Sequence, residues 1–148
     1  MSEMMTQPKP ATPMHLWVVG ILAVLWNGYG AFDYVMTKTQ NVAYMANFTE
    51  EQIAHWQSMP LMANVGWGLG VWGAFIGSLL LLLRSKWAVQ SFRLSVFGVI
   101  LSTIYTYFMS NGFEMGGVGG AIFWAIICLI TLGLMAYAQS MVRSGVLR

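Results

Sequence analysis

The stretch Leu16–Tyr34, LWVVGILAVLWNGYGAFDY, is apolar over a length that can cross a lipid bilayer. A transmembrane helix needs about 20 residues, each rising about 1.5 Å along the axis. The stretch also carries Asn27 and Asp33, two polar residues that the hydrocarbon of a membrane accommodates only at a cost in free energy. We therefore predict that it forms the first transmembrane helix.

The composition of the whole chain agrees with a membrane location. Only 8% of its 148 residues are charged and 57% are hydrophobic, whereas soluble domains carry about 25% charged residues. No basic stripe interleaved with aromatic residues is present, which argues against a nucleic-acid partner and leaves the lipid bilayer as the expected one. The single cysteine, Cys128, excludes an intramolecular disulfide and is interpreted as a packing residue.

The apolar runs predict an all-α membrane protein, a bundle of four transmembrane helices. The helices are expected at residues 15–36, 61–83, 88–109 and 121–141. Residues 1–14 are polar and rich in proline, and we expect a disordered tail there, followed by a single domain over residues 15–148. A flexible glycine-rich turn is expected at residues 111–120, between the last two helices.

The loop between the first two helices contains a helix signal of its own. Thr49-Glu50-Glu51-Gln52 has the form of a capping box, and Pro60 ends the helical pattern that follows. We expect a short helix over residues 50–59 that lies at the membrane interface or covers the outer end of the bundle.

The charges predict how the chain is threaded. With four spans, every lysine and arginine except Lys38 falls on the side of the two termini. The residues on that side are Lys9, Arg84, Lys86, Arg93, Arg143 and Arg148. By the positive-inside rule, both the N-terminus and the C-terminus are expected in the cytoplasm.

Small residues recur along one face of the second helix, in steps of four, three and four. They are Gly66, Gly70, Gly73 and Gly77. Such a face allows two helices to approach closely in lipid. The first helix offers a similar face, with Gly20, Ala23, Asn27 and Gly30. The simplest prediction is that these two helices pack together, or that one of the faces forms a dimer contact.

Five residues are candidates for contact with a solute. They are Trp26, Asn27, Asp33, Tyr34 and Tyr105. Asn27 lies near the middle of the bilayer, where it needs a partner such as Ser78, and Trp26 beside it could stack on a ligand. The other three residues are expected at the outer mouth of the bundle. The alternative interpretation is an interhelical hydrogen bond at Asn27 and an aromatic interface belt with a solvated carboxylate outside it.

Several chemistries are set aside. His15 and His55 fall at opposite membrane faces, so they and Cys128 cannot form a usual metal or haem site. No catalytic set lies at one depth. We expect no enzymatic activity, no catalytic residue, no metal and no cofactor.

Several short motifs resemble those of one family. They are Leu25-Trp26-Asn27, Gly30–Tyr34, Phe48–Gln52, Gly70–Gly73 and Gly77–Arg84. The chain resembles a family of small four-helix bacterial inner-membrane proteins that often carry the name "sugar transporter". The resemblance implies a multi-pass topology in the bacterial inner membrane. The family has no established active site to carry over.

Two functional hypotheses follow. The first is a small-solute transporter, for a sugar or a similar solute, in which Asn27 or Asp33 lines a cavity. It would work as a homo-oligomer, because a single chain with four helices is too small to enclose a transport path. A structural or accessory subunit of a larger membrane complex would instead be a packed bundle with an apolar face for its partner.

Overall fold

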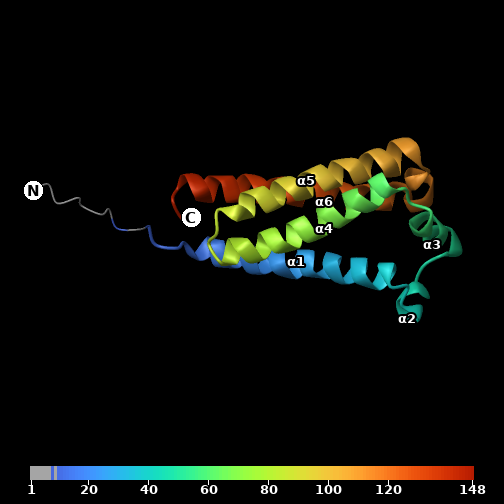
Figure 1. Cartoon of the computed structure of the whole chain (residues 1–148), viewed down its shortest axis with the longest axis horizontal. Helices are drawn as coiled ribbons and strands as arrows, with labels where there is room; N and C mark the ends of the chain where they lie inside the picture. The colour runs from blue at the N-terminus through green and yellow to red at the C-terminus, as the bar shows by residue number, and fades with distance from the viewer. Residues whose placement is uncertain (1–7, 9) are drawn as a thin grey trace, which may run out of the picture.

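The computed structural model describes residue 8 and residues 10–148 (Figure 1). The described part contains six α-helices, one π-helical segment and no strand. The elements are α1 (Met14–Lys38), α2 (Val42–Met45), α3 (Glu50–Gln57), α4 (Leu61–Leu82), α5 (Trp87–Thr103), η1 (Ile104–Met109) and α6 (Gly112–Arg143). The all-α fold is therefore confirmed. Residues 1–7 and 9, within the predicted disordered tail, lie outside the described residues.

Four helical segments are long and apolar enough to cross a membrane: α1, α4, α5 continued by η1, and α6. By length and composition the chain is thus a multi-pass membrane protein. The start of α1 and the C-terminus lie at one end of the bundle, and α2 and α3 lie at the other (Figure 1). We call these the terminal end and the lid end.

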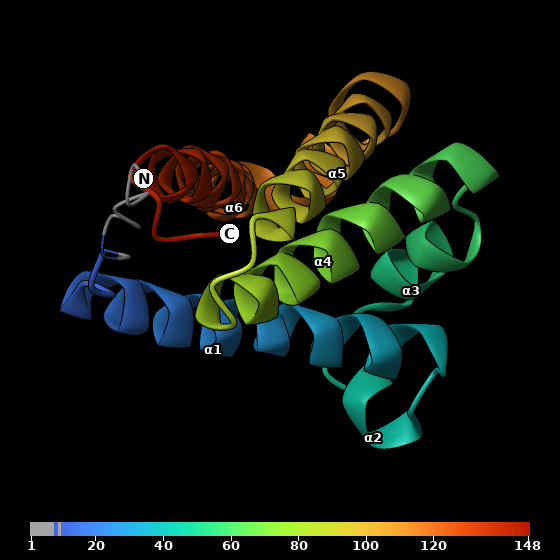
Figure 2. The same cartoon turned by 60° about the vertical axis from the view of Figure 1, so that its left-hand side comes forward.

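The helices are arranged as a curved row rather than as a closed ring (Figure 2). α4 packs against α1 on one side and α5 on the other, and α6 packs against α5. α1 and α6 meet through two aromatic pairs. The His15 ring lies 5.7 Å from the Tyr137 ring and hydrogen-bonds its hydroxyl, and the Trp26 and Phe123 rings lie 6.1 Å apart.

The glycine face of α4 packs against α5, not against α1 as the sequence analysis predicted. A Cβ added at Gly66 would lie 2.8 Å from Leu101 Cβ, and one at Gly73 would lie 2.9 Å from the backbone of Ser91 and of Ser95. The other two glycines of the face, Gly70 and Gly77, also have α5 atoms as their nearest neighbours. On α1, by contrast, Gly30 has no neighbour within 4 Å.

Two serines of α5 hold this close interface together. The Ser91 hydroxyl donates to the Gly73 carbonyl at 2.7 Å, and the Ser95 hydroxyl donates to the Gly70 carbonyl at 2.6 Å. The glycines leave these carbonyls accessible to a neighbouring helix. Hydrogen bonds of this kind contribute about 0.6 kcal/mol each to helix association in membranes. The α4–α5 pair is therefore the tightest part of the bundle.

The predicted flexible turn at residues 111–120 is instead the first part of α6, which begins at Gly112. The expectation of a helix limited to residues 121–141 was therefore wrong. The helix is interrupted at Gly117, where φ is 63° and ψ is −164°. This conformation is open to glycine and strained for other residues, so the glycine-rich segment supplies a kink within a helix.

The predicted helix in the outer loop is present as α3, two residues shorter than expected. The Thr49 hydroxyl accepts from the Gln52 amide at 3.2 Å, and the Gln52 side chain accepts from the Thr49 amide at 3.0 Å. This reciprocal pair is the capping box that the sequence predicts. At the lid end, Asn111 donates to the Glu51 carboxylate at 3.4 Å, so α3 covers the start of α6.

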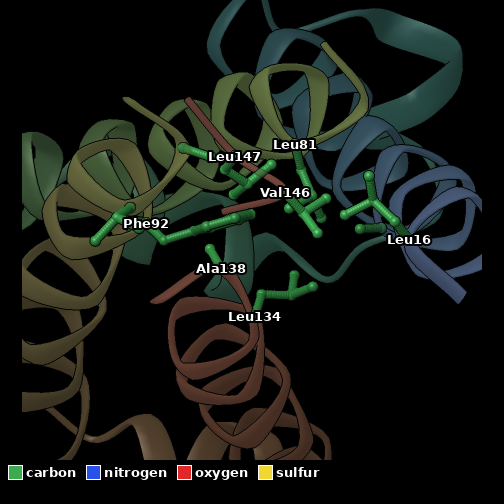
Figure 3. Packing of buried hydrophobic residues seen from close by; sticks show 10 residues of the cluster. Leu16, Leu81, Phe92, Leu134, Ala138, Val146 and Leu147 are labelled. Atoms are coloured by element: carbon green, nitrogen blue, oxygen red, sulfur yellow. The ribbon is translucent and has the colours of Figure 1, made fainter. Parts of the chain in front are cut away.

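The C-terminal residues fold back into the terminal end of the bundle (Figure 3). Gly145 has a φ of 78°, and the Val146 amide donates to the Met141 carbonyl at 3.0 Å, as in a Schellman motif. The reversal places Val146 and Leu147 among buried residues of all four spanning helices, and they are only 6% and 3% exposed. Their main partners are Leu16, Leu81, Phe92, Leu134 and Ala138. The terminal end is thereby filled with side chains.

Candidate solute-binding groove

Asn27 takes part in an interhelical hydrogen bond. Its Nδ2 donates to Ser78 Oγ on α4 at 2.9 Å, and that hydroxyl donates in turn to the Ala74 carbonyl at 2.7 Å. Ser78 is fully buried. The polar groups of this part of the membrane-spanning core therefore satisfy one another, as the simpler interpretation of Asn27 predicted.

Trp26 points in a different direction from Asn27. It faces Phe123 on α6 and is 37% exposed. The two residues therefore do not form the joint stacking and hydrogen-bonding site that was considered for a sugar.

Asp33 is hydrogen-bonded to a residue of the outer loop. The Tyr44 hydroxyl donates a hydrogen bond to the Asp33 carboxylate. Burial and this carboxylate raise the pKa of Tyr44 above its ordinary value, so the phenol stays protonated. The Tyr44 ring also contacts Phe32 and Phe48, with ring centroids 5.7 and 5.4 Å apart, and Phe48 contacts Trp56 at 4.9 Å. This aromatic series ties α2 and α3 to the end of α1.

Tyr34 belongs to a second aromatic group, formed with α4. Its ring centroid lies 4.7 Å from that of Trp67 and 6.0 Å from that of Trp72. The Lys38 ammonium lies 6.0 Å from the Tyr34 ring and 5.3 Å from the Trp67 ring, within the range of cation–π attraction. It also hydrogen-bonds the Asn64 side chain.

Beside this group, a groove of about 520 Å³ opens between α1, α2, α3 and α4; we call it the lid groove. It is lined by Thr37, Lys38, Gln40, Met45, Ile53, Trp56, Gln57, Asn64 and Trp67. Two indole rings, three side-chain amides and one ammonium group thus face a space that is large enough for a monosaccharide. Aromatic faces with a few polar groups are typical of sites for small polar ligands.

Tyr105 lies away from the lid groove, under α3. It is 9% exposed, and its ring centroid is 5.5 Å from that of His55. Burial lowers the pKa of His55 below its usual value. The pair is part of the contact between the lid helix and η1.

The structure therefore places the five predicted residues in five different surroundings. Asn27 lies in the α1–α4 interface, Trp26 against α6, Asp33 under the loop and Tyr105 under the lid. Only Tyr34 adjoins the lid groove, through Lys38 and Trp67. None of the five is among the residues that line it.

The sequence did contain a signal for the groove. Tyr34 and Lys38 are four residues apart at the outer end of one helix, and Asn64 and Trp67 are three apart at the outer end of the next. Both spacings place the two side chains on one helical face.

Within the described residues, no three His, Cys, Asp or Glu side chains come together in a way that could hold a metal ion. Comparison of the chain with models of protein families, with curated proteins and with solved structures found no match.

Proposed function

We propose that this membrane protein is a small-solute transporter that takes a polar, sugar-like solute at the lid groove. The observation that carries the proposal is the groove itself, in which Trp56 and Trp67 offer aromatic faces beside the Lys38 ammonium. The resemblance to small four-helix proteins named sugar transporters supports the same solute class.

The chemistry of the lid groove fits a hydroxylated ring. The apolar face of a sugar can stack on an indole, while Gln40 and Gln57 supply amide donors and acceptors for its hydroxyls. The Asn64 amide is held by Lys38 and by the backbone carbonyls of Met59 and Pro60, and it fixes the position of the Lys38 ammonium. Lys38 adds one positive charge. We expect the groove to favour a sugar that carries a carboxylate or phosphate over the matching neutral sugar.

The proposal includes a second copy of the chain and a defined orientation. Val146 and Leu147 fill the terminal end of the single chain, so a path through one copy is closed there. A homo-oligomer supplies a path between copies. The bacterial inner membrane follows from the resemblance, and cytoplasmic termini follow from the basic residues at the terminal end.

Tryptophan fluorescence tests solute binding directly, because two tryptophans line the groove. The purified protein is titrated with glucose and with glucuronate in mild detergent. We expect a saturable change that is stronger for glucuronate, is weakened by Lys38→Gln and is unaffected by Arg148→Gln at the opposite end. A titration that stays flat for both sugars, or one unchanged by Lys38→Gln, would reject the groove as the solute site.

A second candidate is an accessory subunit of a larger membrane complex. One observation favours it: Asn27 and Asp33, which the transporter hypothesis expects in a cavity, are both bonded within the chain. A second observation is that α6 is the least buried of the four spanning helices. Native mass spectrometry of protein purified from its own membrane separates the candidates, since an accessory subunit arrives with a stoichiometric larger partner.

A further inference from the structure

A second groove, of about 600 Å³, lies at the terminal end between the start of α5 and the end of α6. We call it the basic groove. It is lined by Lys86, Trp87, Val89, Gln90, Arg93, Gln139, Val142 and Arg143. Three of these residues are cationic, two are amides and none is acidic. All the acidic side chains of the described residues belong to the end of α1, to α3 or to the start of α6, at the lid end.

The cations come from two facing helical surfaces. Lys86 is the N-cap of α5, and Gln90 and Arg93 follow it on that helix in steps of four and three. Gln139 and Arg143 are four apart on α6. These spacings hold each set on one face. The two faces therefore present their positive charges to the same space.

Arg93 places a positive charge in this groove that a bound anion would stabilise. It lies six residues after Trp87, which is about 9 Å along the spanning helix from its start. Its side chain contacts the neutral Gln90 amide at 3.4 Å, and among the residues that the structure describes Arg143 reaches only a backbone carbonyl, at 3.5 Å. A guanidinium at this depth is stabilised when an oxyanion pairs with it, and phosphate oxygens match its geometry.

We propose that the basic groove binds the phosphate of an anionic phospholipid from the surrounding bilayer. Trp87 and Val142 border the groove and are 62% and 37% exposed. They provide an apolar surface along which the acyl chains run, next to the cations that hold the headgroup. Basic pockets between transmembrane helices are suited to such headgroups. A soluble phosphate compound shares the charge but gains nothing from this apolar border.

Native mass spectrometry with defined lipids tests the proposal. The purified protein is mixed with phosphatidylglycerol or phosphatidylcholine, and the bound fraction is measured for each. We expect a preference for phosphatidylglycerol, and a loss of about tenfold in its affinity in Arg93→Gln/Arg143→Gln, because each removed group donates charge-assisted hydrogen bonds. Arg148→Gln, which removes one positive charge at the same end but outside the groove, is expected to keep the wild-type affinity.

Three results would overturn the proposal: equal binding of the two lipids, full retention of phosphatidylglycerol by the double variant, or an equal loss in Arg148→Gln. Competition with glycerol phosphate distinguishes the source of the phosphate, since displacement of the lipid by the soluble compound at equal concentration contradicts a lipid site. If the double variant does not fold, the exposed Lys86→Gln provides the same comparison. The proposal is independent of solute binding at the lid groove.

Discussion

The α4–α5 interface leads to the sharpest prediction, because one glycine of α5 has no space for a side chain. A Cβ added at Gly98 would lie 2.4 Å from the Gly70 nitrogen and 2.5 Å from the Gly66 carbonyl oxygen. Ordinary van der Waals contact begins at 3.4 Å. Because both atoms belong to the backbone, Gly98→Ala requires the two helices to separate by about 1 Å at this point.

The expected loss of stability combines three terms. Overpacking of this kind costs about 1–3 kcal/mol. Separation also lengthens the hydrogen bonds from Ser91 and Ser95, which are now 2.7 and 2.6 Å, and each contributes about 0.6 kcal/mol. Alanine has a higher helix propensity than glycine, which offsets up to about 1 kcal/mol of this loss of stability. We expect a net loss of about 2 kcal/mol for Gly98→Ala.

Reversible unfolding in mixed micelles, followed by far-UV circular dichroism, measures this loss. The matched control is Gly133→Ala on α6, where an added Cβ meets no atom within 4 Å. The control gains only helix propensity, so its stability is expected to equal or exceed that of the wild type. If Gly98→Ala were as stable as Gly133→Ala, the close approach of α4 and α5 would be refuted.

Three further predictions concern other parts of the bundle. Asn27→Leu and Ser78→Ala are each expected to cost about 1 kcal/mol in the same unfolding assay, and the double variant little more, because all three variants lose the same interhelical hydrogen bond between Asn27 and Ser78. Burial lowers the pKa of His55, so its neutral form stabilises the folded lid above its usual pKa of 6.5, and this stability is lost as pH falls through the lower folded pKa. The protection of α3 amides against hydrogen exchange, measured relative to the intrinsic exchange rate at each pH, is expected to fall on acidification in the wild type but not in His55→Phe. Leu147→Ala is expected to cost about 2 kcal/mol and to speed exchange of the Lys86 amide, which donates to the last residue of the chain.

The fold was largely readable from the sequence because its determinants are local. A run of about 20 apolar residues is sufficient to predict a spanning helix, and the residues of the capping box at Thr49 lie within four positions of one another. The exception is the segment from Gly112 to Gly120, where glycine content suggested a turn. The helix nevertheless continues through this segment, and the irregularity is confined to Gly117, whose positive φ is open to glycine.

The site was harder to predict from the sequence than the fold. The position of a residue along a spanning helix fixes its depth in the bilayer but not the direction in which its side chain points. Asp33, Tyr34 and Tyr105 were grouped since they fall at one level of the bilayer. The structure turns Asp33 toward the loop, Tyr34 toward α4 and Tyr105 toward the lid. Direction depends on which helices are neighbours, and neighbours are set by contacts between distant parts of the chain.

The partner of the glycine face illustrates how direction can be recovered. Ser91, Ser95, Gly98 and Ser102 recur on α5 in the same steps of four, three and four as the glycines of α4. Two antiparallel helices with matching runs of small residues can stay in contact over several turns, whereas the face proposed on α1 contains Asn27, whose side chain prevents an equally close approach. Comparing the spacing and bulk of small-residue runs on all helices, rather than their presence on two, therefore identifies α5 as the neighbour that the structure places against α4.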